Sequence, residues 1–149
     1  MKLHLPMILT LIAVSVFFSG CSTNMLTDPV ADLVNRPWNL QTYNDGTGHF
    51  IPVDPSEAFI MVFSPDGRFN GSGGSCLSLT GRYTADGQVI KLSDVSPSYG
   101  SGCAAGSEAR AMYDRYVDLL TNSTKFNVDD NQMSLSYYDV RKFLIFAKE

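Results

Sequence analysis

The sequence predicts a mainly β domain that carries one α-helix. Short apolar or alternating stretches recur through residues 36–149, and turn signals rich in Gly, Asp and Pro separate them. One segment, residues 107–120, breaks this pattern with apolar side chains at helical spacing. Many short strands with frequent turns are typical of a sandwich or a barrel. We therefore expect a small α+β fold in which the helix packs on the strands.

The first expected strands are residues 38–43 and residues 58–63, and the second is apolar throughout, which is typical of a central strand. Residues 64–67, Ser-Pro-Asp-Gly, have Pro and Gly at favoured turn positions and start a hairpin into residues 68–70. Similar turns at 84–87 and 128–131 separate the later strands. Those strands are expected at residues 77–83, 88–92, 125–128, 132–137 and 141–146.

A glycine-rich stretch, Gly71-Ser-Gly-Gly-Ser75, lies near the middle of the chain. Glycine allows a sharp turn or a close approach of the backbone that other residues do not allow as cheaply. Such a loop can also bind phosphate through backbone amides. This stretch lacks the GxxxxGK[ST] order and no helix follows it. We therefore interpret it as a flexible or bulged strand connection.

Residues 107–120 predict one amphipathic helix. Ser107 is a suitable N-cap, and Glu108 places a negative charge near the positive end of the helix dipole. Asn122 marks the expected end. The apolar stripe consists of Ala109, Met112, Tyr113, Tyr116, Leu119 and Leu120. We interpret this stripe as core, and we expect Met112, Tyr116 and Leu119 to be buried.

Residues 1–20 are interpreted as a signal peptide, because Lys2 precedes an apolar run that is shorter than a membrane span. The run ends in Phe18-Ser-Gly-Cys21, which resembles the bacterial lipoprotein signal, although Phe18 stands where that signal usually has Leu. The resemblance implies that Cys21 is lipidated and that Ser22 directs the protein to the outer membrane, facing the periplasm. The alternative is an ordinary signal peptide followed by an incidental cysteine.

Residues 21–35 are polar and are interpreted as a tether, with a brief helical turn around Val30, Leu33 and Val34 as one option. Residues 36–149 form the expected domain. The chain has 11 basic and 15 acidic residues, and removal of residues 1–20 takes away one Lys. This acidic balance, without a basic run, argues against nucleic acid as a partner and against electrostatic adhesion to anionic lipid. Membrane attachment is therefore expected through acyl chains, such as palmitate, on Cys21.

The chain has three cysteines, and lipidation of Cys21 leaves Cys76 and Cys103 in an oxidising compartment. We predict a disulfide between them. The alternatives are two free thiols or one catalytic thiol. The sequence has no CxxC motif, and His49 is the only histidine after residue 20.

The order of several motifs resembles the META domain, also called the HslJ-like family. These motifs are Trp38-Asn-Leu40, the run Asp-Gly-Arg-Phe-Asn-Gly at 66–71, Cys76 followed by Gly81-Arg-Tyr83, and Cys103 ahead of the helix. The family's Gly-Cys-Asn appears here as Ser75-Cys76-Leu77. The resemblance implies a small, partly open antiparallel β-barrel with one helix, about residues 107–121, packed on it. It also implies a bacterial envelope protein linked to stress responses, and it supplies no catalytic residues.

Candidate catalytic groups do not combine into a motif. Ser101 and Ser107 with Glu108 lack a base for a triad, and the pair Asp129 and Asp130 falls short of the oxygen ligands that Ca²⁺ needs. We therefore predict no catalytic, cofactor or metal site. The expected function is non-enzymatic binding of a protein partner or an apolar ligand. The alternatives are a pilotin-like assembly helper for an outer-membrane or secretion complex, or a hydrolytic or redox enzyme.

Overall fold

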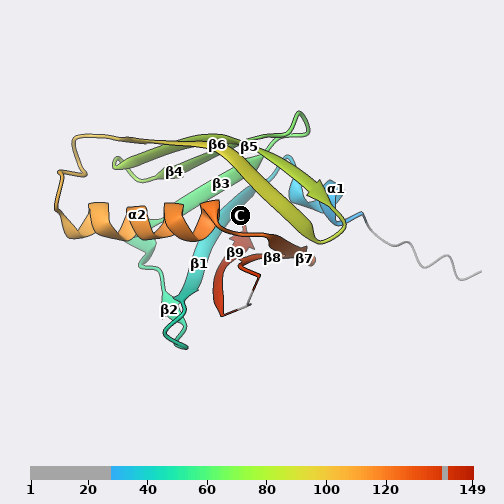
Figure 1. The fold of residues 1–149 in the computed structure, drawn as a ribbon. Helices are drawn as coiled ribbons and strands as arrows, with labels where there is room; N and C mark the ends of the chain where they lie inside the picture. The colour runs from blue at the N-terminus through green and yellow to red at the C-terminus, as the bar shows by residue number, and fades with distance from the viewer. Residues whose placement is uncertain (1–27, 139–140) are drawn as a thin grey trace, which may run out of the picture.

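The computed structural model describes residues 28–138 and 141–149. In this part of the chain, nine antiparallel strands form one sheet that curves into a ring, and one main helix packs against it (Figure 1). The expectation of a mainly β fold with one packed helix is confirmed. The strands are β1 (Pro37–Asp45), β2 (Ile51–Pro52), β3 (Phe59–Phe63), β4 (Arg68–Gly73), β5 (Leu77–Asp86), β6 (Val89–Tyr99), β7 (Lys125–Val128), β8 (Gln132–Ser136) and β9 (Lys142–Lys148).

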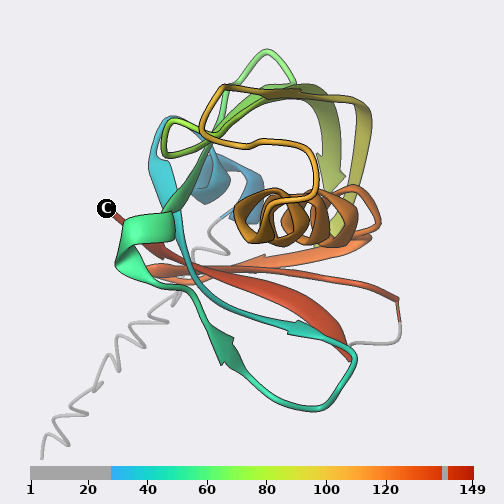
Figure 2. The same cartoon turned by 90° about the vertical axis from the view of Figure 1, so that its left-hand side faces the viewer.

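The ring has two unlike seams. At the first, which we call the closed seam, β1 pairs with β9 from Trp38↔Lys148 to Asp45↔Lys142. At the second, β6 and β7 share one ladder pair, Val89↔Lys125. The main helix, α2 (Glu108–Thr121), contacts both β6 and β9 and lies along this gap (Figure 2). We call the gap with its helix the helix seam.

Most of the glycine-rich stretch is regular strand, which differs from the expected flexible or bulged connection. Strand β4 continues past Asn70 because Gly71 and Gly73 still pair with both neighbouring strands. The two glycines point into the ring, where an added Cβ at Gly71 would press on the Phe59 ring and one at Gly73 would overlap the Tyr113 ring. Gly74 then makes the turn with a positive φ of +51°. The glycines therefore supply room for aromatic side chains as well as a turn.

Strand β6 is longer than the expected residues 88–92. It runs on to Tyr99 and includes Pro97, which is paired with Leu79 of β5. Proline lacks a backbone N–H and is tolerated in a strand whose other edge has no partner strand. Beyond Val89, β6 has no described strand on its β7 side. Tertiary context thus extends the strand beyond the residues that the sequence predicts.

Large side chains fill the interior of the ring. The indole Nε1 of Trp38 donates a hydrogen bond to the carbonyl of Leu33 at 2.9 Å, so the one polar atom of that ring is satisfied. The largest side chains with less than 2% exposure are Trp38, Tyr116, Phe59, Phe63, Phe69, Phe146, Leu33, Leu40, Met61, Leu79, Ile90 and Leu120. The interior is therefore a packed core.

Part of the segment expected to be a tether packs on the domain. Helix α1 (Pro29–Leu33) is capped by Asp28, whose carboxylate accepts a hydrogen bond from the amide of Val30 at 3.0 Å. Leu33 is fully buried, and the amide of Asn35 donates to the carbonyl of Phe63 at 2.9 Å. A five-residue helix is too short to be stable alone, so burial of Leu33 holds it. The packed part of the chain therefore reaches back before Arg36.

Helix α2 starts and ends where the sequence predicts. The Ser107 side chain accepts a hydrogen bond from the amide of Arg110 at 3.2 Å, and Asn122 is the C-cap. The short helix η1 (Pro55–Glu57) lies between β2 and β3. The expectation that Met112 is buried is wrong, because Met112 lies at the margin of the stripe and is only half-buried. The buried residues of α2 are Tyr113, Tyr116, Leu119 and Leu120.

Candidate functional site

The two cysteines that remain after Cys21 meet at one end of the helix seam. Cys76 lies in the turn between β4 and β5, and Cys103 lies in the loop between β6 and α2. They form a disulfide-bonded pair whose Cα atoms are 4.9 Å apart, within the range that a disulfide requires. Cys76 is 7% exposed and Cys103 is 4% exposed. The bond therefore ties the glycine-rich turn to the start of the helix and is shielded from solvent.

Backbone contacts hold the two loops together beside the disulfide. The amide of Gly100 donates to the carbonyl of Cys76 at 2.8 Å, and the amide of Cys103 donates to the carbonyl of Gly100 at 3.0 Å. A Cβ at position 100 would overlap the carbonyl of Ser75. Glycine, which has no Cβ, is therefore required at position 100 for the two loops to come close enough to form the disulfide.

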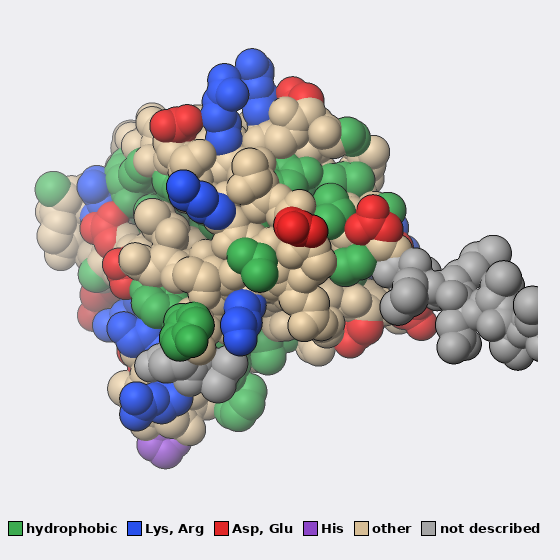
Figure 3. All heavy atoms as spheres, turned by 45° about the vertical axis from the view of Figure 1, so that its right-hand side comes forward, with side chains coloured by type: hydrophobic (Ala, Val, Ile, Leu, Met, Phe, Trp, Pro, Cys, Tyr) green, Lys and Arg blue, Asp and Glu red, His purple; other side chains and the backbone are tan. Residues whose placement is uncertain are grey.

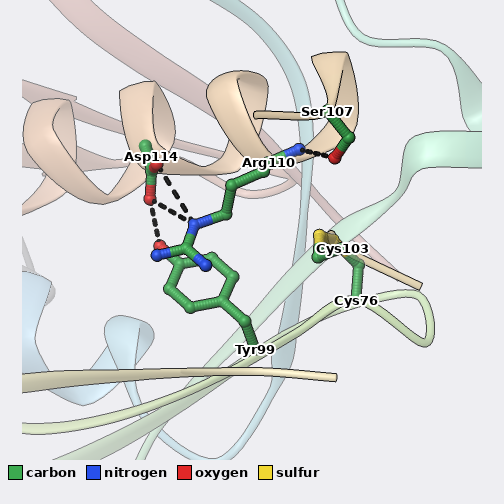
Figure 4. The surroundings of a disulfide bond; sticks show 6 residues. All are labelled: Cys76, Tyr99, Cys103, Ser107, Arg110 and Asp114. Carbon is green, nitrogen blue, oxygen red and sulfur yellow. Dashed lines mark hydrogen bonds and ion pairs between the residues drawn. A yellow bond between two sulfur atoms is a disulfide. The ribbon is translucent and has the colours of Figure 1, made fainter. Parts of the chain in front are cut away.

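A second cluster lies next to the disulfide and also bridges β6 and α2 (Figure 4). The hydroxyl of Tyr99 donates a short hydrogen bond to the carboxylate of Asp114. Arg110, one helical turn before Asp114, donates from Nε to the same carboxylate at 3.1 Å. Its guanidinium carbon lies 3.2 Å from the centre of the Tyr99 ring. The three side chains form a polar clamp on the outside of the helix seam, which we call the Tyr99 clamp.

The charges of the Tyr99 clamp are mutually stabilised. The hydrogen bond from Tyr99 is the main cause that holds the pKa of Asp114 below its usual value, and the Arg110 guanidinium acts in the same direction. Burial, followed by the hydrogen bond to Asp114, raises the pKa of Tyr99. The carboxylate stays ionised and the phenol stays neutral near pH 7. The clamp is therefore a structural contact in which each group has a partner.

The interior face of the helix seam is aromatic. Tyr116 lies at the centre, with its ring 5.1 Å from Tyr43, 5.9 Å from Tyr113 and 6.0 Å from Phe59. Burial is the main cause that raises the pKa of Tyr116. Tyr113 occupies the space that Gly73 leaves open. Helix α2 is thus held by aromatic packing inside, by the Tyr99 clamp outside, and by the disulfide at its start.

The other residues considered in the sequence lie apart from this junction. His49 is exposed in the β1–β2 loop, and Asp129 and Asp130 are exposed in the β7–β8 turn, where Asp129 accepts a hydrogen bond from the amide of Gln132. Cys21 lies outside the described residues. Within residues 28–138 and 141–149, no group of three or more His, Cys, Asp or Glu side chains is placed to hold a metal ion. Across the same residues, no helix is long and apolar enough to cross a membrane.

Sequence reasoning missed the Tyr99 clamp. The spacing of Arg110 and Asp114 is a visible i,i+4 pair on a helix. Tyr99 gives no comparable signal, because it lies beyond the strand predicted at residues 88–92 and its partners lie in another element. Only the alignment of β6 with α2 brings the three side chains together.

A mainly β ring whose remaining gap is covered by one helix defines a class of small domains. A disulfide and aromatic packing hold that helix in place. The META domain family model matches residues 31–149. The chain therefore belongs to the META domain family, and the resemblance noted in its sequence is confirmed. The matched range includes Leu33, in agreement with the packing of α1.

Solved structures share the fold at low sequence identity. A protein from Burkholderia xenovorans is 20% identical with a TM-score of 0.63, and the match covers 81% of this chain and 88% of that one. A DUF4847 family protein from Bacteroides vulgatus is 15% identical with a TM-score of 0.55, covering 77% and 93%. At this identity the likeness concerns the fold alone. No curated protein matches the chain.

Proposed function

We propose that this protein is a lipid-anchored component of the bacterial cell envelope, held in the outer membrane by acyl chains on Cys21 and facing the periplasm. Its META domain acts without catalysis, by binding a protein partner through its surface, in envelope maintenance or a stress response. The positions and pairing of the three cysteines support this proposal. Cys21 stands at the end of a lipoprotein-like signal, and the other two are paired as expected for an exported domain.

The packed interior supports surface binding over an internal ligand site. Fully buried aromatic rings such as Trp38, Phe59 and Phe146 occupy the centre of the ring. An apolar ligand would have to displace them, and close-packed protein interiors accept added groups only at a cost in stability. The non-enzymatic assignment rests on the sequence, which has one histidine after residue 20 and no nucleophile–base motif.

The first test is membrane fractionation of a Cys21→Ser variant in a bacterial host. We expect the unmodified protein to sediment with outer membranes after a salt wash and the variant to be released, because acyl chains supply the anchoring energy. Ser22→Ala is the matched control, since it leaves the lipidated residue in place. Sedimentation of the Cys21→Ser variant with washed membranes would contradict the proposal.

An assembly helper that escorts an outer-membrane or secretion complex is the alternative within the same class. The position of the gene discriminates the two roles, since a secretion operon favours the helper and an isolated gene favours stress protection. Affinity purification from envelope extract, with the anchored protein as bait, then identifies the partner. Recovery of secretion components would favour the helper.

A further inference from the structure

Two arginines lie directly opposite each other on the outer face of the sheet. Arg68 is the first residue of β4 and pairs with Arg82 of β5. Next to this pair, the amide of Tyr83 donates a hydrogen bond to the carbonyl of Gly67 at 2.8 Å. The pair is therefore of the non-hydrogen-bonded kind, in which opposite side chains lie closest, with Cβ atoms about 4.5–5.5 Å apart. Like charges at this spacing destabilise a sheet, so the arrangement calls for a compensating anion.

Hydrogen bonds and packing hold the backbone that carries the two arginines. The hydroxyl of Tyr83 donates to the carbonyl of Ser64 at 2.8 Å, so β5 holds the turn that precedes β4. On the inner side, a Cβ at Gly81 would overlap the buried Phe69 ring. The two arginines therefore extend from a fixed part of the sheet, and an incoming ligand meets a preformed surface.

Each arginine has one acidic neighbour that does not satisfy it fully. The Nε atom of Arg68 lies 3.6 Å from the Asp66 carboxylate. The Nε atom of Arg82 lies 3.8 Å from the Asp94 carboxylate. Both distances exceed the hydrogen-bond range, and neither guanidinium makes a hydrogen bond to any residue that the structure describes. The arginine side chains are 66% and 65% exposed, so their N–H donors are open to an anion from solution.

Asp94 reaches the arginines through a β-bulge. The register of β5 and β6 shifts between Thr80 and Arg82, so that Asp94 and Val95 both lie opposite Gly81. Asp94 has a positive φ of 53°, which aspartate tolerates better than most side chains. Bulges re-aim side chains and are frequent beside functional sites. Here the bulge brings the Asp94 carboxylate onto the same face as Arg82.

A surface cavity of about 240 Å³ lies between the arginines and the bulge. Lys91 adds another positive charge on this face, because it pairs with Thr84, the next outward-facing residue of β5 after Arg82. The top of Figure 3, which is the β4–β5 side of Figure 1, shows blue side chains standing together with red side chains on either side. The residues that line the cavity are Arg68, Thr80, Gly81, Arg82 and Asp94.

The local charge selects a singly charged anion. The three basic side chains, Arg68, Arg82 and Lys91, exceed the two acidic ones by one positive charge. A carboxylate carries one negative charge, and its two oxygens match the planar fork of a guanidinium. A phosphate dianion would bring excess negative charge beside Asp94. The site therefore favours a carboxylate over a phosphate.

The flanking acids favour a carboxylate that a protein presents. Asp66 comes from the β3–β4 turn and Asp94 from β6, so they approach the arginine pair from opposite sides. Basic groups beside the incoming carboxylate would meet them, which is how charged interfaces select their partners. A small organic acid lacks such groups, and on arginines this exposed it would stay largely in water, whereas small-molecule sites bury most of their ligand.

We propose that the arginine pair of β4 and β5 is the place where the protein partner docks an acidic side chain that has basic neighbours. The carboxylate lies between the guanidinium groups of Arg68 and Arg82, and the basic neighbours meet Asp66 and Asp94. This inference rests on the proposed binding of a protein partner, and it names the surface and the charge pattern of that partner. It does not depend on the lipid anchor.

The test is a titration followed by NMR, with the chain from residue 21 carrying Cys21→Ser so that no acyl chain is present. The probe is the peptide Lys-Gly-Glu-Gly-Lys, capped at both ends. It is compared with Lys-Gly-Gln-Gly-Lys, with acetate and with inorganic phosphate, all at constant ionic strength. We expect the Glu peptide to give saturable shifts of the Nε–H signals of Arg68 and Arg82. Its dissociation constant should be lower than those of the Gln peptide and acetate by about threefold or more.

Charge-changing variants sharpen the test, with the Gly81 amide as the signal followed in each. Arg82→Gln should weaken binding of the Glu peptide about threefold or more, because it removes one of the two guanidinium forks. Asp94→Asn should strengthen acetate binding but weaken Glu-peptide binding, because the Asp94 carboxylate repels acetate and attracts the lysines of the peptide. Arg115→Gln is the matched control, since Arg115 is also an exposed arginine paired with one aspartate but lies on α2.

Melting curves verify that each variant is folded. The proposal is overturned if the Glu peptide gives no saturable shift, or if Arg115→Gln weakens its binding as much as Arg82→Gln does. It is also overturned if acetate or phosphate binds as tightly as the Glu peptide, since the site would then take a small acid or a phosphate-bearing ligand. Membrane fractionation and affinity purification of the anchored protein do not involve these probes, so the proposed function and this inference fail separately.

Discussion

The closed seam and the helix seam complete the same ring by different means. At the closed seam, β1 and β9 share a ladder along most of their length. At the helix seam, two further backbone hydrogen bonds, from Ile90 to Thr124 at 3.1 Å and from Phe126 to Gln88 at 2.9 Å, accompany the one ladder pair. Backbone pairing depends little on which side chains the strands carry. The helix seam depends on particular side chains and on a covalent bond, so substitutions should affect it more.

The largest effect is expected from Tyr116→Ala. The ring is 1% exposed and contacts three other aromatic rings, so its removal leaves a cavity under α2. The free energy of unfolding in urea should fall by about 3–5 kcal/mol. Arg115→Ala, one residue earlier on the exposed face, should cost less than about 1 kcal/mol. Equal losses at the two positions would show that aromatic packing does not hold the helix seam.

Removal of the disulfide ranks next. The cysteines are 27 residues apart, and the chain-entropy estimate for a loop of this size is roughly 3.6 kcal/mol. We expect Cys76→Ser with Cys103→Ser to lower the free energy of unfolding by about 2–4 kcal/mol. The Cys21→Ser chain is the reference, so that only the paired cysteines differ. Labelling of that chain after unfolding without reductant should find no reactive thiol, and two reactive thiols would refute the pairing.

Gly73→Ala should have an intermediate effect. Its methyl group would overlap the Tyr113 ring, and overpacking of this kind costs about 1–3 kcal/mol. Tyr113→Leu in the same chain removes the overlapped ring atoms, so the double variant should lose less than the sum of the two single losses. If the losses in the free energy of unfolding in urea were strictly additive, position 73 and Tyr113 would not compete for space.

The smallest effect concerns the Tyr99 clamp and its dependence on pH. The pKa of Asp114 is lower in the folded chain than in the unfolded one, so its contribution is present above the unfolded value near pH 4 and is lost as pH falls through the folded value. Asp114 is 51% exposed, so Asp114→Asn should cost less than about 1 kcal/mol at pH 7.

The same variant should flatten the loss of stability below about pH 4. Asp130→Asn, in the β7–β8 turn, is the control and should show the same loss of unfolding free energy below about pH 4 as the unmodified chain. If Asp114→Asn also shows that unchanged loss at acidic pH, the clamp does not contribute to folding stability.

The sequence predicted most of the ring but not its seams. Turn signals such as Ser-Pro-Asp-Gly at 64–67 located the hairpins, because turn geometry selects residues locally. The cap at Ser107 and the apolar stripe located α2 for the same reason. The length of β6, the half-burial of Met112 and the packing of α1 were not predictable. They depend on which element lies opposite, and local patterns do not report that.

Of the candidate sites, one was predictable from the sequence and one was not. The pairing of Cys76 with Cys103 was predicted by counting the cysteines of a chain expected to be exported, without any knowledge of distance. The Tyr99 clamp joins residues from separate elements, β6 and α2, and no local pattern predicts that contact.

The sequence alone therefore predicted the strand and helix types and the family, and it is the source of the hypotheses of an export signal and a lipidated Cys21. These are properties of local pattern and composition. The tertiary structure decided how the ring closes, why Gly73 lies beneath Tyr113, and which aromatic side chains remain exposed. Those outcomes depend on side-chain volume and backbone pairing between segments distant in sequence, and such long-range contacts exist only once the chain has folded.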